Sequence, residues 1–222
     1  MCVTYETVKN NPEINTYIRQ ADASMRAMGF TEHSFAHVAK CAADASRLLA
    51  ELGCPDREVE LARIAGYMHD IGNVVNRDDH AHSGALMAFR LLDKLGMPPE
   101  EIAMVITAIG NHDEHTAHPV NAVAAALIIA DKSDVRRSRV RADNMENIKG
   151  DIHDRVNYAV ENAELTLNKE AGTITLSMNI DQRMCSVMDY FEIFMGRMIL
   201  CRKAAEKLGL QFKLIINEQQ LI

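Results

Sequence analysis

The chain has 222 residues and a formal net charge of −7, which argues against broad contact with a nucleic-acid backbone. Its five cysteines are scattered and include no Cys-x-x-Cys pair, which favours reduced thiols in a cytoplasm over disulfides or a thiolate zinc site. No apolar run is long enough to cross a membrane, and residues 1–10 lack the apolar core of a secretion signal. We therefore expect a cytoplasmic protein that has one hydrophobic core and no membrane or general nucleic-acid partner.

The first two thirds of the chain are predicted to be helical, because apolar residues recur there at three- and four-residue spacing. Start and stop signals such as Pro98 and Gly96 separate the segments. The expected helices cover residues 12–28, 31–52, 56–70, 80–96, 98–110, 121–139 and 144–162. The first half of the helix at 121–139 is almost wholly apolar, which predicts a central position for it.

The C-terminal part of the chain is predicted to mix helix and strand. Alternating residues at 164–167 and 173–178 flank a segment of turn composition and indicate a β-hairpin. A long methionine-rich helix at 183–207 and a strand at 212–216 follow. The predicted fold is mainly α with a small C-terminal α+β element, divided into residues 1–162 and 163–222, the second part packed on the first.

The methionine-rich helix carries a wide apolar stripe that three strands would hardly cover. The stripe either packs on the helices of the same chain or contributes to a homodimer. We expect the dimer, with this C-terminal segment lying away from the cluster of polar residues described next.

The pair His69-Asp70, at the end of a predicted helix, follows an apolar helical face and is expected to point into the protein. A buried carboxylate needs a cation, hydrogen bonds or a proton as compensation. Eight of the nine histidines fall between His33 and His118, so a metal ion is the compensation that the sequence favours.

Further candidate ligands stand at other helix ends. His37 and His112 supply imidazoles, and Asp131 supplies a carboxylate on a helix stripe that is otherwise apolar. Each residue alone would more often be a hydrogen-bonded core or cap residue. Together with His69-Asp70 they form the mixture of nitrogen and oxygen donors expected around a divalent cation that assists hydrolysis.

The order of these motifs resembles the HD-domain metal-dependent phosphohydrolases, and the resemblance covers roughly residues 31–141. That family is all-α, and its pattern is a His, then a His-Asp pair, then a distant Asp. The resemblance implies a metal site made by His37, His69, Asp70 and Asp131, with His33 in the surroundings of the site. The family often has Lys three residues after the Asp of the His-Asp pair, where this chain has Asn73.

Members of this family that bind two metals have further histidines, which His80 and His112 resemble. The resemblance implies one or two divalent ions (Mn, Fe, Zn, Mg or Co), with Asp70 placed to bridge two of them. His82 is the alternative to His80, and Asp113 stands where many two-metal members have a second His. The remaining histidines, His115, His118 and His153, are interpreted as loop or surface residues.

Basic residues concentrate at 132–141, directly after Asp131. They form either a solvated helix end or a phosphate-binding cluster. If the helix continues to 139, Lys132 and Arg139 lie on the side of Asp131 and are the candidate substrate-binding residues.

The resemblance implies a phosphohydrolase in which a metal-activated water attacks a nucleotide or another small phosphoester. Asp70, His80 and His112 are the candidate catalytic residues. Two alternatives stay open, a di-iron oxygenase on the same fold and a non-catalytic HD protein that senses a ligand.

Overall fold

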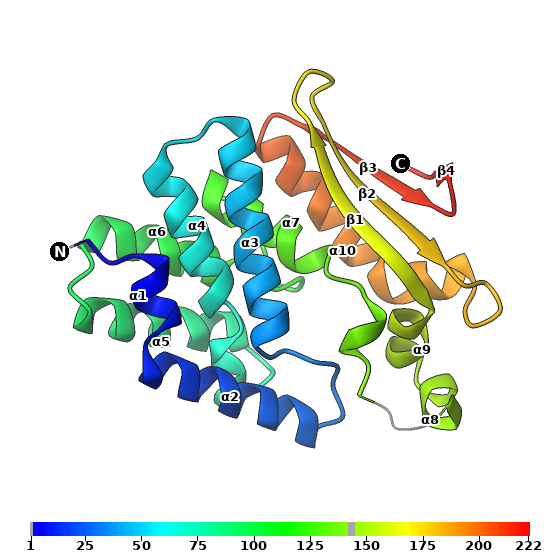
Figure 1. Cartoon of the computed structure of the whole chain (residues 1–222), viewed down its shortest axis with the longest axis horizontal. Helices are drawn as coiled ribbons and strands as arrows, with labels where there is room; N and C mark the ends of the chain where they lie inside the picture. The colour runs from blue at the N-terminus through cyan, green and yellow to red at the C-terminus, as the bar shows by residue number, and fades with distance from the viewer. Residues whose placement is uncertain (1, 142–144) are drawn as a thin grey trace.

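The computed structural model describes residues 2–141 and 145–222, which form a mainly helical protein with a small sheet near the C-terminus (Figure 1). The helices are α1 Tyr5–Lys9, α2 Pro12–Ala27, α3 Phe35–Leu52, α4 Asp56–Met68, α5 His80–Lys94, α6 Pro99–Gly110, α7 Ala122–Lys132, α8 Met145–Gly150, α9 Ile152–Ala159 and α10 Val187–Lys207. Two short 3₁₀ helices are η1 Ile71–Val74 and η2 Arg137–Arg139, and the strands are β1 Val160–Asn168, β2 Thr173–Ile180, β3 Gln211–Ile216 and β4 Gln219–Gln220. The predicted fold class is confirmed.

Helix α7 connects the two halves of the molecule. Figure 1 shows α1 to α6 on one side of it, and the sheet with α10 on the other. Ala124 and Leu127 of α7 pack into the core of the helical half, whereas Ala125 and Ile128 pack into the core beneath the sheet. An almost wholly apolar helix is needed where both sides are buried, so the predicted central position is confirmed.

The sheet has the strand order β1-β2-β3-β4. β1 and β2 form the predicted antiparallel hairpin, and β3 pairs with β2 in parallel after the crossover through α10. The expected division at residue 162 lies within β1 and stays a prediction of domain organisation. The homodimer also stays a prediction, and three apolar side chains of α10 are exposed: Met188, Met195 and Ile199.

Three helix predictions need correction. α3 begins at Phe35 rather than at residue 31, because Glu32 Oε1 accepts a hydrogen bond from the Ser34 backbone N–H (2.7 Å) ahead of the helix, and His33 therefore lies in a loop. α7 ends at Lys132 rather than at 139, because the following segment turns back and Arg139 Nη1 donates to the Asp134 carbonyl (2.9 Å).

The third correction concerns residues 144–162. Asn144, the predicted start, lies outside the described residues, and the rest forms α8, α9 and the beginning of β1. The backbone leaves the helical conformation at Val160 because residues 160–168 pair with β2. Local apolar spacing could not show this pairing.

Two glycines allow the backbones around the histidines to approach one another. A Cβ on Gly66 would lie 2.7 Å from Ala42 Cα, so α4 packs directly on the backbone of α3 and brings His69 beside His37. A Cβ on Gly72 would lie 2.0 Å from the carbonyl oxygen of His80, so the start of α5 sits against η1. Both contacts need a residue without a side chain.

Within the described residues, the structure contains no helix that combines the length and the apolar character of a membrane span.

Candidate metal centre

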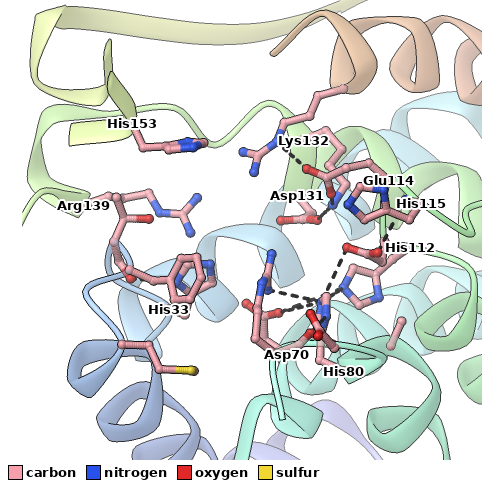
Figure 2. A pocket seen from close by; sticks show the side chains of 18 of the residues that line it. His33, Asp70, His80, His112, Glu114, His115, Asp131, Lys132, Arg139 and His153 are labelled. Atoms are coloured by element: carbon pink, nitrogen blue, oxygen red, sulfur yellow. Dashed lines mark hydrogen bonds and ion pairs between the residues drawn. The ribbon is translucent and has the colours of Figure 1, made fainter. Parts of the chain in front are cut away.

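The fold brings all six predicted ligands together, and four of them, Asp70, His80, His112 and Asp131, line one cavity (Figure 2). His37 comes from α3, the His69-Asp70 pair follows α4, and Asp131 is near the end of α7. His80 is the first residue of α5, and His112 follows α6. The four imidazoles and Asp70 are buried, and Asp131 is half-buried.

The imidazoles form two pairs, and Asp70 lies between them. The Nε2 atoms of His37 and His69 are 3.2 Å apart, as are those of His80 and His112. Asp70 Oδ2 is 3.6 Å from His37 Nε2 and 3.4 Å from His69 Nε2. Asp70 Oδ1 faces the other pair, 3.6 Å from His80 Nε2 and 4.0 Å from His112 Nε2. One carboxylate therefore serves two adjacent groups of donors.

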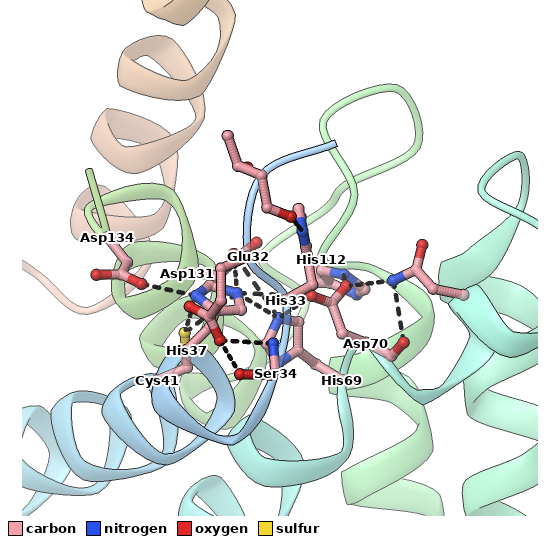
Figure 3. Close-up of polar contacts among 12 residues, drawn as sticks. Glu32, His33, Ser34, His37, Cys41, His69, Asp70, His112, Asp131 and Asp134 are labelled. Carbon is pink, nitrogen blue, oxygen red and sulfur yellow. Dashed lines mark hydrogen bonds and ion pairs between the residues drawn. The ribbon is translucent and has the colours of Figure 1, made fainter. Parts of the chain in front are cut away.

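Asp131 joins His37 and His69 to form the first group of donors (Figure 3), and His80 and His112 form the second group. Asp131 Oδ1 lies 3.3 Å from His37 Nε2 and 3.7 Å from His69 Nε2. Asp113 lies near the second group, with Oδ1 4.0 Å from His80 Nε2. Nitrogen and carboxylate donors at these separations suit a divalent cation in each group.

Hydrogen bonds at Nδ1 fix which nitrogen of each ring can bind a metal. His69, His80 and His112 donate from Nδ1 to the backbone carbonyls of Gly66 (2.8 Å), Arg77 (2.9 Å) and Ile109 (2.6 Å). His37 donates from Nδ1 to Asp134 Oδ2 (2.7 Å). Because a neutral imidazole carries one proton, each Nε2 then presents a lone pair.

Two lone pairs that face each other at 3.2 Å repel unless a cation or a proton lies between them. Burial lowers the pKa of His80 and that of His112, and the charges of Arg77 on His80 and of Lys132 on His112 lower them further. Asp70 raises the pKa of His80 but does not offset burial. The second pair is therefore neutral near pH 7, which is the ligand form of histidine.

Asp70 also has an unsatisfied oxygen. Asn73 Nδ2 donates to Asp70 Oδ1 (2.9 Å), whereas Asp70 Oδ2 is buried without a hydrogen-bond partner in the described part of the chain. A buried, unpaired carboxylate oxygen is costly, and a cation would compensate it. The residues present therefore fit a metal ion in both groups.

Cys41 is a neighbour of the first group that the sequence interpretation did not include. Its Sγ is 3.6 Å from His37 Nδ1 and 3.7 Å from His37 Nε2. The signal for it was present, because residues four apart on a helix share one face. Burial raises the pKa of the Cys41 thiol, and the neighbouring carboxylates of Asp131 and Asp134 raise it further.

The cavity above the centre has a volume of about 590 Å³. His33, His115 and His153 line it together with His80 and His112, and His115 and His153 are exposed, in agreement with their interpretation as surface residues. The structure places His80 in the centre with 3% of its side chain exposed, whereas the His82 side chain is 56% exposed. The geometry thus favours His80 over His82 as the ligand.

The two predicted substrate-binding cations both line the cavity, in different settings. Lys132 Nζ is buried between Asp131 Oδ2 (2.7 Å) and Glu114 Oε2 (2.6 Å). Arg139 reaches the cavity through η2 rather than through a continued α7, and its Nε donates to the Glu32 carbonyl (3.0 Å). The location of Arg139 in the cavity was correct, but the helical reason for it was wrong.

Among the residues that line the cavity and that the sequence interpretation missed are Arg77, Phe194 and Arg197. Phe194 and Arg197 belong to α10, so the expectation that the C-terminal segment lies away from the metal ligands was wrong. It failed because α10 packs against α7, and the packing of two distant helices leaves no local signal in either sequence.

Comparison with known proteins agrees with this geometry. Residues 34–148 match the HD domain family, and the chain therefore belongs to that family. An uncharacterized protein, MJ1020, of Methanocaldococcus jannaschii is 24% identical over 183 residues, which cover 72% of this chain and 70% of that protein. Ribonuclease Y of Opitutus terrae is 29% identical over 119 residues, or 52% of this chain, and the match spans only 20% of the ribonuclease.

Among solved structures, a predicted HD superfamily hydrolase from an uncultured Thermotogales bacterium aligns with a TM-score of 0.44 and 27% identity. The alignment covers 56% of this chain and 67% of that protein.

Proposed function

We propose that this protein is a phosphohydrolase that depends on two divalent metal ions and acts on a small phosphorylated substrate, foremost a nucleotide. One observation carries the proposal: two pairs of facing Nε2 atoms lie on either side of Asp70, each pair 3.2 Å apart. In this proposal His37, His69 and Asp131 hold one ion, His80 and His112 hold the other, and Asp70 contributes to both. When bound, such ions polarise a phosphoryl oxygen and lower the pKa of a bound water.

The chain itself orients these ligands in advance. Asn73 holds Asp70 through Oδ1, and Asp134 holds the ring of His37 through Nδ1. Backbone carbonyls hold the other three rings in the same way. Hydrogen bonds of this kind fix the ring orientation and strengthen each imidazole as a donor, which supports a functional centre over a chance cluster of histidines.

The cavity supports a small phosphorylated substrate. Its volume of about 590 Å³ suits a molecule the size of a nucleotide, and four cationic side chains line it: Arg77, Lys132, Arg139 and Arg197. Figure 2 shows the Arg139 guanidinium directed into the cavity from the side on which His33 lies. Phe30, also in the lining and 41% exposed, offers an apolar surface for a base. The net charge of −7 favours such a substrate over a nucleic-acid polymer.

Elemental analysis of protein purified without chelator, followed by a hydrolysis screen, tests the proposal. The screen covers phosphomonoesters, mononucleotides, dinucleotides and cyclic nucleotides. We expect bound divalent metal, and phosphoester hydrolysis that stops on chelation and returns when metal is added back. Bound iron with oxygen consumption and no hydrolysis would instead indicate a di-iron oxygenase. Absence of metal would indicate a non-catalytic HD protein.

A further inference from the structure

Arg197 lines the cavity but comes from α10, outside the segment that matches the HD family. Its Nε donates to Glu114 Oε1 (2.7 Å), and its guanidinium lies 4.7 Å from the ring centre of the buried Phe194. A carboxylate and an aromatic face thus hold the planar group in one place. The side chain still has 24% of its surface exposed.

Two other cations of the cavity, Lys132 and Arg139, are more fully engaged, whereas Arg77 Nη1 lies beside the second pair of imidazoles, 3.4 Å from His80 Nε2. Lys132 Nζ lies between two carboxylates, at 2.6 Å and 2.7 Å. Arg77 Nη1 donates to Asn73 Oδ1 (3.3 Å), and Arg139 Nη1 donates to the Asp134 carbonyl (2.9 Å). Within the described residues, the hydrogen bonds of Arg197 involve Nε alone, so both of its Nη groups have donors available.

Glu114 forms ion pairs with two cations, Lys132 and Arg197, which have different roles. Its Oε2 holds Lys132, which in turn holds Asp131 Oδ2 and leaves Asp131 Oδ1 directed at His37 Nε2 (3.3 Å). Its Oε1 holds Arg197. Lys132 is therefore placed to position a candidate metal ligand, whereas Arg197 faces the cavity.

We propose that Arg197 binds the phosphate group of the substrate, so that the C-terminal element completes an active site that the HD segment supplies only in part. The inference rests on the proposed function. A guanidinium presents parallel N–H donors whose spacing matches two oxygens of a phosphate. Its link to Asp131 through Glu114 and Lys132 places these donors beside the metal centre.

The test compares Arg197→Gln with the wild type in the full-length, metal-loaded protein. Calorimetry measures the binding of inorganic phosphate, and steady-state kinetics measures KM and kcat for the phosphoester found in the screen. Because a charge-assisted hydrogen bond is lost, we expect phosphate affinity to fall and KM to rise by roughly 10- to 100-fold. The metal content should equal that of the wild type.

Two further variants separate binding from folding. Arg197→Lys keeps the charge and can still pair with Glu114, but it loses the planar fork, so we expect phosphate affinity between those of the wild type and Arg197→Gln. Arg202→Gln changes an exposed arginine of the same helix and should match the wild type.

Several outcomes would overturn the inference. They are unchanged phosphate affinity and KM in Arg197→Gln, a loss of affinity that merely accompanies a loss of metal, and absence of phosphate binding by the wild type. A wild type that binds phosphate through Arg197 but hydrolyses no phosphoester would contradict the proposed function and leave the anion site standing.

Discussion

The candidate metal centre has two halves, which are built in different ways. The first half is the group of His37, His69 and Asp131, and the second half is the group of His80 and His112. In the second half, His80 and His112 each donate to a carbonyl three residues earlier in the chain, so a single turn of backbone orients each ring. In the first half, His69 is oriented in the same way by the Gly66 carbonyl, but His37 depends on Asp134, which is 97 residues away in the sequence. Local backbone geometry therefore orients both rings of the second half, whereas the first half also needs a contact made by tertiary packing.

Asp134 must stay ionised in a buried position in order to hold the ring of His37. Burial opposes ionisation of this carboxylate, but the hydrogen bond from His37 and the charges of Arg139 and Arg136 outweigh it and hold the pKa of Asp134 below its usual range. The first half thus needs an ion-pair network that assembles only on folding. Four predictions test this difference between the halves.

The largest expected effect comes from Asp70→Asn, because Asp70 is the one ligand that faces both halves. The substitution removes the anionic donor from each and replaces one oxygen with an amide nitrogen that binds metal poorly. We expect metal content to fall from about two ions per chain to none, with loss of hydrolysis. Elemental analysis measures the first, and circular dichroism must show that the helices remain. Full metal content in this variant would remove the basis of the proposed centre.

His80→Ala should affect the second half alone. We expect it to remove about one of two ions and most of the hydrolytic activity, because His112 and Asp70 are too few ligands to hold that ion. His82→Ala is the matched control on the same helix turn, and we expect full metal content since its side chain is exposed. The reverse pattern would show that His82 is the ligand.

Gly72→Ala should disturb the second half through the backbone. The added Cβ would meet the His80 carbonyl oxygen at 2.0 Å, so η1 and the start of α5 must separate. Overpacking of this kind typically costs about 1–3 kcal/mol. We expect lower thermal stability together with weaker binding of one ion. Gly196→Ala, whose Cβ would meet no atom within 4 Å in the interior of α10, is the control; it should leave metal binding unchanged and raise thermal stability slightly, because Ala favours a helix over Gly. Equal melting temperatures for the two variants would contradict the close contact.

The smallest effect is expected from Asp134→Asn, which keeps the shape of the side chain and removes its charge. Loss of such a partner typically lowers metal affinity about 10- to 100-fold. We expect this loss for one ion only, the one held by His37, while the ion held by His80 and His112 keeps its affinity. Calorimetric titration separates the two, and an equal loss at both would mean that the halves are not independent.

The contrast between the halves also explains what the sequence could reveal. His37, His69-Asp70 and His112 stand at predicted helix ends, so local patterns were enough to nominate them. His80 was nominated only through the family resemblance, with His82 as the alternative. Asp134, the partner of His37, was missed because it lies in a turn that was predicted to be helix. The end of α7 depends on the contact between Arg139 and Asp134, which forms only on folding.

The C-terminal element was predicted well in its strands and poorly in its position. Alternating apolar residues indicated β1 and β2, and the strand predicted at 212–216 corresponds to β3, whereas β4 was not predicted. The placement of Arg197 beside Glu114 arises from the packing of α10 on α7, which no spacing within either helix encodes.

The central claim, that Asp70 lies between two metal ions, is tested most directly by titrating metal-free protein with Mn²⁺ and counting the ions bound at saturation. The account predicts two ions per chain in the wild type and one in His112→Ala, with the fold of both unchanged by circular dichroism. Binding of a single ion by the wild type, unaffected by His112→Ala, would contradict the second half of the centre. Absence of binding would contradict the whole.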